Sequence, residues 1–296
     1  MRILVPIDLW DPEHDPRGVL DRVLPWAIRL GGKIDLLCSR PPEIFPSWHE
    51  LPHELVAALR AQWVAVDAGL ADRLESALAE VPDAHRGRAR VEHGDPWTEL
   101  AAFGEGYDLA ILTTHARTGI ARVWAGSVTE RFVARSGVPT LVMHAEHPRL
   151  AAEAPLRVLV GVDLNEASAV NLASAEGWAA RLGIHVIDAL FVQPGQPTSP
   201  GWEPTVHAIR MAEDWVELGT LYQQRLEAEM AAAVVPASRG QAVVRTGAQA
   251  HEILEAAQEH DLLIVGSHHR VGLSHLWHGS ISERVVRRAP CPVLVM

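Results

Sequence analysis

The chain of 296 residues contains the same segment twice. Residues 108–143 and 261–296 align without a gap at a constant offset of 153, and 17 of the 36 aligned positions are identical. Three shorter matches occur in the same order in both halves: RILVPID at 2–8 with RVLVGVD at 157–163, WAIRLG at 26–31 with WAARLG at 178–183, and VEHG at 91–94 with VRTG at 244–247. A whole unit of roughly 145 residues is therefore duplicated, which is a common size for one domain.

The two halves are joined by HAEHPRLAAEAP at 144–155, a short polar segment that is rich in Ala and Pro. Such a composition is typical of a linker between domains. We predict two domains, residues 1–147 and 155–296, each of which is large enough to bury its own core.

Composition excludes several classes of protein. The formal net charge is −11, whereas binding to a phosphate backbone needs clustered Lys and Arg, so nucleic acid is not expected as a partner. The spacing of Cys38 and Cys291 fits neither a disulfide framework nor a thiolate zinc site. No secretory signal and no run of ~18 apolar residues is present, so we expect a soluble cytoplasmic protein.

Apolar runs and helical periodicities alternate along each half. Runs such as 3–7 and 262–265 are apolar throughout, as in parallel strands that helices cover on both faces. The other predicted elements are strands at 34–38, 88–92, 109–113, 140–143, 158–162, 185–192, 242–245 and 293–296, and helices at 19–30, 53–78, 96–103, 127–136, 167–182, 205–234, 250–259 and 280–288. The predicted fold class is α/β, with two doubly wound, Rossmann-like domains of five parallel strands each.

Three features of the second half point to one ligand site. Asp163 ends the first strand, Gly266 opens the loop after the fourth strand, and Gly279 with Ser280 precedes the last helix. Ligands of such sheets bind at the carboxyl ends of the strands, where the winding reverses. Glycine lets backbone N–H groups approach an anion, and a helix N-terminus with a Ser cap attracts one. With the guanidinium of Arg270 added, these are the groups that a nucleotide triphosphate tail requires.

This combination resembles the universal stress protein family in its tandem form, over essentially the whole chain. The branch of that family known to bind adenine nucleotides carries G-x-x-G, nine residues, and then G-S or G-T. The second half has Gly266, His269 in place of the second glycine, and Gly279-Ser280; the first half has Thr113, Ala116 and Gly126-Ser127. The resemblance implies a stress-response protein that binds ATP or AMP, with Mg²⁺, in its second domain.

The resemblance also assigns residues to the nucleotide, among them Val192, whose backbone would face the adenine. The full set is Asp163, Val192, Gly266, His268, His269, Arg270, Gly279, Ser280 and Ile281 in the second half, and Asp8, Gly126 and Ser127 in the first. The first half is the weaker candidate, because Thr113 and Ala116 lack the conformational freedom of glycine.

Structural roles are open for some of these residues. Asp8 and Asp163 could cap the turns after their strands, and Ser127 and Ser280 could be ordinary helix N-caps. The ring of His269 could obstruct a phosphate or contact it through an N–H group, and we predict obstruction.

Metal and enzyme functions are alternatives that the spacing does not favour. Four histidines, at 268, 269, 275 and 278, form the densest histidine group in the chain, but they lack the spacing of a helical metal motif. Histidines of a loop beside an anion site explain them better. No motif pairs a nucleophile with a base, so we predict a binding protein, and slow ATP hydrolysis with Mg²⁺ held by an Asp is the enzyme alternative.

The two long helices suggest a different function. They contain large apolar residues such as Trp63, Val66, Trp215 and Leu218. Helices of this kind could cover an apolar cavity and bind a hydrophobic small molecule or a partner protein. The reading that we favour is that they pack against the sheet or against the other half of the chain.

The last strand of each half is apolar and terminal. An exposed apolar edge strand is a liability unless it is paired. Single-domain universal stress proteins dimerise through this edge, so the resemblance implies that residues 140–143 and 293–296 pair within one chain as an intrachain pseudo-dimer. Whether two such chains also form a homodimer is left open by the sequence.

Overall fold

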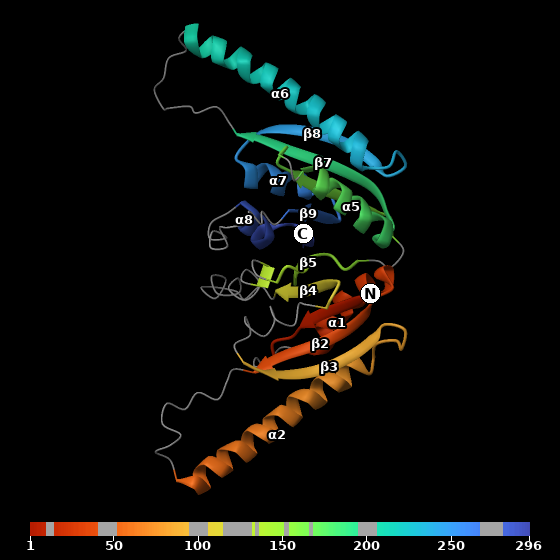
Figure 1. Cartoon of the computed structure of the whole chain (residues 1–296), viewed down its shortest axis with the longest axis vertical. Coiled ribbons are helices and arrows are strands. Elements are labelled where there is room, and N and C mark those ends of the chain that lie inside the picture. The colour runs from red at the N-terminus through yellow and green to blue at the C-terminus, as the bar shows by residue number, and fades with distance from the viewer. Residues whose placement is uncertain are drawn as a thin grey trace. The chain divides into compact units, whose positions relative to one another are not determined.

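The computed structural model describes residues 1–9, 15–40, 52–94, 106–114, 132–133, 136–150, 154–165, 168–194, 206–266 and 281–296 (Figure 1). The chain divides into two compact units. Met1–Leu141 with Arg149–Ala152 make up unit 1, and Val142–Pro148 with Glu153–Met296 make up unit 2. Both units are built from parallel strands and helices, which confirms the predicted α/β fold class.

Unit 1 has the strand order β3-β2-β1-β4, and β5 follows β4. β1 pairs in parallel with β2 and with β4, and β2 pairs in parallel with β3. The strands are β1 (Arg2–Pro6), β2 (Lys33–Arg40), β3 (Arg86–His93), β4 (Leu109–Thr114) and β5 (Thr140–His144), and the helices are α1 (Pro16–Leu30) and α2 (His53–Leu78). The helices expected at 96–103 and 127–136 lie outside the described residues, except that Phe132 and Val133 are helical and buried.

Unit 2 has the strand order β10-β9-β6-β7-β8, again with parallel neighbours. The strands are β6 (Leu156–Val162), β7 (Ile184–Pro194), β8 (Arg239–Gly247), β9 (Leu262–Val265) and β10 (Val293–Val295), and the helices are α5 (Ser168–Leu182), α6 (Val206–Ala233), α7 (Gln249–Ala257) and α8 (Ile281–Arg288). The crossovers through α5 and α6 run one way along the sheet and those through α7 and α8 the other way. Because such crossovers are right-handed, the two pairs of helices cover opposite faces.

The residues of the strands explain why the sheets form. All four residues of β9 and all three of β10 are buried, as expected where helices cover both faces of a parallel sheet. The helices end where glycine permits it: Gly31 and Gly183 follow α1 and α5 with φ of 58° and 65°. The predicted end of the first helix at Gly31 is therefore confirmed.

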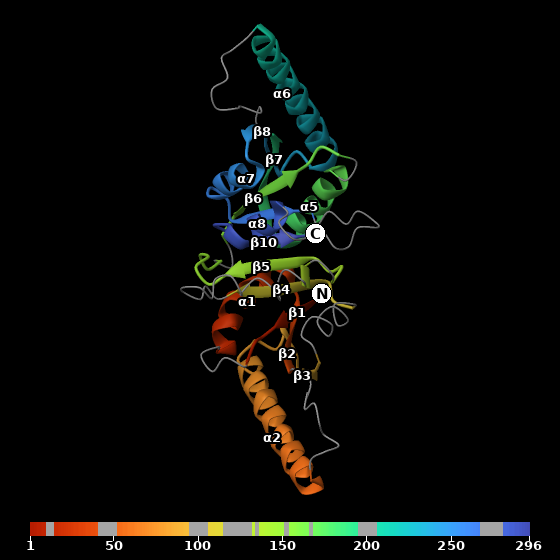
Figure 2. The ribbon, with the colours of Figure 1, turned by 90° about the vertical axis from the view of Figure 1, so that its left-hand side faces the viewer.

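The buried side chains described in the two long helices lie in the C-terminal third of each helix. All buried residues of α2 fall in its last third, beginning at Leu70, and its first part extends beyond the sheet of unit 1 (Figure 2). In α6 the buried side chains among those described are Leu226 and Met230, whereas Val216 is exposed. None of the helices that the structure describes is long and apolar enough to cross a membrane.

Candidate functional site

The winding of unit 2 reverses between β6 and β9. β6 pairs with β7 on one side and with β9 on the other, in register at Val160 and Ile264. Because these strands are parallel, the residues that follow them, Asp163 and Gly266, emerge at the same edge of the sheet. Asp163 is exposed there. The structure thus brings together two of the residues that the sequence assigned to a ligand.

The turn after β6 contains a strained residue. Leu164 has a φ of 52°, and among the described residues it is the one non-glycine with a positive φ. Next to it, the backbone N–H of Asn165 donates to Ser168 Oγ (2.8 Å), and the N–H of Ser168 donates to the Asn165 carbonyl (3.0 Å). These two bonds tie the turn to the start of α5. Strained backbone of this kind concentrates at functional sites, where the surrounding structure holds it in place.

Gly266 lies directly against the side chain of Asn171 on α5. A Cβ atom added to Gly266 would lie 2.6 Å from Asn171 Nδ2, so no larger residue fits without displacing the amide. From the sequence, we expected a glycine here because it lets a phosphate approach the backbone. The structure shows a second reason, which is that the side chain of Asn171 packs against this position. Asn171 was not predicted as a site residue. The sequence contains a sign of this contact, because the two residues differ together between the halves. Val19 of the first half aligns with Asn171, and Thr113 aligns with Gly266.

Val192 lies near the end of β7, and its side chain is buried. Its carbonyl accepts a long hydrogen bond from Gln249 Nε2 at 3.4 Å. The neighbouring Gln193 is also buried, and its Oε1 lies 3.3 Å from where a Cβ on Gly219 of α6 would stand. A ligand that used the backbone of Val192 would therefore lie beside the Gln249 amide.

The corresponding edge of unit 1 differs in chemistry. Arg40, which aligns with Gln193, is buried at the end of β2, and its Nε lies 2.7 Å from Asp67 Oδ1 on α2. Its guanidinium carbon lies 4.5 Å from the ring centroid of Trp63, and His93 Nε2 lies 3.0 Å from the other carboxylate oxygen of Asp67. These contacts join α2 to the ends of β2 and β3.

Two of the residues expected at the edge of unit 1 are described. Asp8 is exposed just after β1, and Thr113 is partly buried in β4. Because β1 and β4 pair in parallel, both lie towards the same edge. Thr113 places a β-branched side chain where the second unit has Gly266, which is the difference noted in the sequence.

The remaining predicted site residues lie outside the described residues, except Ile281, which begins α8. Those outside are His268, His269, Arg270, Gly279 and Ser280 in the second half, and Gly126 and Ser127 in the first. The four histidines of the metal alternative lie there too. Within the described ranges, no group of three or more His, Cys, Asp or Glu side chains could hold a metal ion.

The two cysteines are free and buried. Burial raises the pKa of the Cys38 thiol to about 11 and that of Cys291 to about 12. Both side chains are therefore protonated thiols at neutral pH, a state in which cysteine is a poor nucleophile.

The fold and the site define the class of protein: two doubly wound parallel α/β domains, each with an aspartate at the point where the winding reverses. The family model of the universal stress protein family matches residues 1–144 and 156–296. The chain belongs to the universal stress protein family.

Curated relatives are similar over most of the chain. A universal stress protein of Mycobacterium tuberculosis is 28% identical over 267 residues, which is 86% of this chain and 80% of that protein. A universal stress protein of Mycolicibacterium smegmatis is 27% identical over 191 residues, or 64% of this chain and 61% of that protein.

Solved structures show the same fold. A universal stress protein from Archaeoglobus fulgidus has a TM-score of 0.61 and 20% identity, with 99% of this chain and 95% of that chain covered. A functionally unknown protein from Pseudomonas aeruginosa also has a TM-score of 0.61, with 15% identity and coverage of 100% and 92%.

Proposed function

We propose that unit 2 binds an adenine nucleotide, ATP or AMP, at the carboxyl edge of its sheet, and that the chain acts as a nucleotide-binding protein of the stress response. The observation that carries this proposal is the position of Asp163 and Gly266 after adjacent parallel strands at the switch point. Membership of the family and the strained turn at Leu164 support it.

Each part of the edge has a role in this proposal. Asp163 receives a ribose hydroxyl or the adenine edge or, with a triphosphate, Mg²⁺, for which carboxylate oxygens are suitable ligands. The Val192 backbone faces the adenine beside the Gln249 amide. The phosphates lie towards Gly266 and Asn171 and towards the residues that the family resemblance assigns to them, which are His268, His269, Arg270, Gly279, Ser280 and Ile281.

We propose that unit 1 is the weaker nucleotide site, although Asp8, Gly126 and Ser127 repeat part of the pattern. Thr113 narrows the turn over the phosphates. Buried Arg40, held by Asp67, gives the end of β2 a different polar character from that of unit 2.

Native mass spectrometry of the purified full chain tests the proposal. We expect one adenine nucleotide, copurified or added, to bind to each chain. The monomeric chain should hold the nucleotide without a second chain. A chain that gains no mass from ATP, ADP or AMP at saturating concentration would contradict it. Release of phosphate from ATP by the same preparation would reveal the enzyme alternative.

A hydrophobic ligand or partner protein is the second candidate function. The observation in its favour is that α2 has no buried residue before Leu70, although Leu55 and Val64 in this segment are large and apolar. Most of the stability of a helix in a protein comes from packing, and no buried residue of this segment provides it within unit 1. The same mass spectra separate the two functions, because a copurified lipid and a nucleotide differ in mass.

A further inference from the structure

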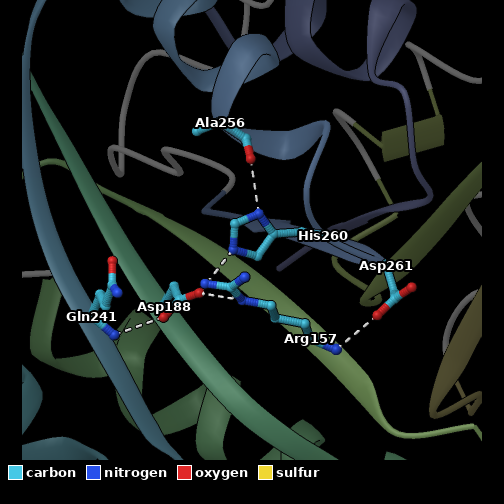
Figure 3. Close-up of polar contacts among 6 residues, drawn as sticks. All are labelled: Arg157, Asp188, Gln241, Ala256, His260 and Asp261. Carbon is cyan, nitrogen blue, oxygen red and sulfur yellow. Dashed lines mark hydrogen bonds and ion pairs between the residues drawn. The ribbon is translucent and has the colours of Figure 1, made fainter.

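A buried polar cluster in unit 2 joins residues of β6, β7 and β8 to His260, which follows α7 (Figure 3). At its centre is Asp188 on β7, whose side chain is 5% exposed. Its Oδ1 accepts the backbone N–H of Gln241 on β8 (2.6 Å), and its Oδ2 accepts Arg157 Nε of β6 (2.8 Å) and lies 3.0 Å from His260 Nε2. Burial opposes the charge of Asp188, but the bonds from Gln241, His260 and Arg157 outweigh it and lower the pKa of this carboxyl group. Asp188 is therefore ionised near neutral pH.

The second ring nitrogen of His260 also faces an acceptor. Nδ1 lies 2.8 Å from the carbonyl oxygen of Ala256, in the last turn of α7, and the side chain of His260 is 7% exposed. A backbone carbonyl and an ionised carboxylate can only accept hydrogen bonds, so both bonds form only when both ring nitrogens carry a proton. The C-terminal end of a helix also favours a cation. The geometry therefore fits the imidazolium form of His260.

Unit 1 contains the same cluster with a donor that does not change charge near neutral pH. Asp35 accepts Arg2 Nη2 (2.9 Å), the backbone N–H of Arg88 (2.8 Å) and Tyr107 Oη (2.9 Å), and Tyr107 aligns with His260. Burial and the bond to Asp35 raise the pKa of Tyr107, so its hydroxyl stays protonated. The duplication thus supplies an internal control.

Charged groups of neighbouring elements lie around the ring of His260. Asp188 faces the ring from β7, and Arg157 shares Asp188 with it from β6. Asp261, the next residue, accepts the backbone N–H of Arg157 (2.8 Å). Burial raises the pKa of the nearby Cys291 thiol to about 12, and the negative charge of Asp261 acts in the same direction. Between pH 6 and 8 Asp188 stays ionised, because its pKa is lowered, and the thiol of Cys291 stays protonated.

We propose that His260 is a pH-sensitive joint of unit 2, in which the protonated ring connects the end of α7 to Asp188 on β7. When the ring loses a proton, one of its two nitrogens faces an acceptor without a hydrogen atom, and that contact becomes unfavourable. The contribution of the joint is therefore complete at the acidic end of the range and is lost as the pH rises and the folded ring deprotonates. β9 begins two residues after His260, so the loosening acts on α7 and β9. Unit 1 lacks this response, because Tyr107 donates its hydrogen bond at both ends of the range.

Hydrogen exchange of the full chain, followed by mass spectrometry at pH 6 and pH 8 and corrected for the intrinsic pH dependence of exchange, tests the proposal. We expect peptides of α7 and the start of β9 to exchange about tenfold faster at pH 8, a factor within the value of one charge-assisted hydrogen bond. Peptides around Tyr107 in unit 1 should not change. His260→Tyr, which copies unit 1, should abolish the pH response, and His251→Gln, at an exposed position of α7, should preserve it.

An equal pH response in the two units, or a response that survives in His260→Tyr, would overturn the proposal. Nitrogen chemical shifts of the imidazole keep it testable should His260→Tyr not fold. Two protonated ring nitrogens at pH 6 support the joint, and a single protonated nitrogen at pH 6 contradicts it.

Discussion

At the scale of single residues, the duplicated carboxylate clusters depend on a glycine. A Cβ atom added to Gly240 would overlap Asp188 Oδ1, and one added to Gly87 would overlap Asp35 Oδ1. In each unit the carboxylate occupies the space of the missing side chain and accepts the N–H of the following residue. Glycine is therefore required at these two positions to leave room for the aspartate side chain, and not to form a turn.

Gly240→Ala should destabilise unit 2. The methyl group displaces Asp188 from the N–H of Gln241 and leaves charged groups of the cluster without their partners, at a cost of ~2–3 kcal/mol in the free energy of unfolding. Urea denaturation measures the loss. Gly177→Ala is the matched control, because a Cβ atom at this helical position meets no atom within 4 Å. It should be neutral or stabilising by up to ~1 kcal/mol, and an equal loss in both variants would refute the role given to Asp188.

His269→Gly should tighten ATP binding. The change restores the G-x-x-G pattern and removes a ring that we predict to obstruct the phosphates. Calorimetric titration of the wild type and the variant at pH 6 and pH 8 measures the effect. Weaker binding by the variant, together with wild-type affinity that falls as the pH rises, would show instead that the ring is a ligand.

At the scale of elements, local patterns predicted the structure well. The sequence predicts a long helix at about residues 53–78, which are the bounds of α2, and continuous apolar runs predict the buried strands. The Asp188 cluster could not be predicted, because its bonds join residues 31 and 72 positions apart and depend on the register of three strands. The contact of Asn171 with Gly266 likewise requires the packing of a helix on a loop.

The two long helices are capped in the same way at their C-terminal ends, by an arginine that donates hydrogen bonds to carbonyl groups there. Arg239 donates from Nε and Nη2 to the Val234 carbonyl (3.2 and 2.7 Å) and from Nη2 to the Ala231 carbonyl (2.9 Å), just as Arg86 bonds to carbonyls at the end of α2. A cation at the last carbonyls of a helix also interacts favourably with the helix dipole.

Arg239→Met should therefore destabilise unit 2 by ~1–2 kcal/mol in urea denaturation, because the carbonyls at the end of α6 lose charged donors while the apolar part of the side chain is kept. Arg225→Met is the control on the same helix. Arg225 is half exposed and forms a pair with Glu229 one turn away, so its loss should cost less than ~0.5 kcal/mol. Similar losses in both variants would contradict the capping role.

At the scale of the whole molecule, the two units keep one scaffold and differ at their edges. Domain boundaries at 147 and 155 remain our proposal, as does the pairing of the last strands, 140–143 and 293–296, in a pseudo-dimer. Cysteines introduced in pairs, one in each of these strands and with Cys38 and Cys291 replaced by Ala, test the pairing. A disulfide that forms under mild oxidation within one chain is the expected result. Pairs that stay reduced at every register of the two strands would contradict it.

We propose that the second copy is the principal nucleotide site and that the first copy is the weaker one. The most direct measurement compares thermal unfolding of the wild type, Gly279→Val and Gly126→Val with and without ATP. The wild type should gain ~2.7 kcal/mol of stability at a hundredfold excess of ATP over the dissociation constant. Gly279→Val should lose this gain, because the added side chain blocks backbone approach to the phosphates, whereas Gly126→Val should keep it. Equal losses in the two variants, or no gain in the wild type with any adenine nucleotide, would contradict the claim.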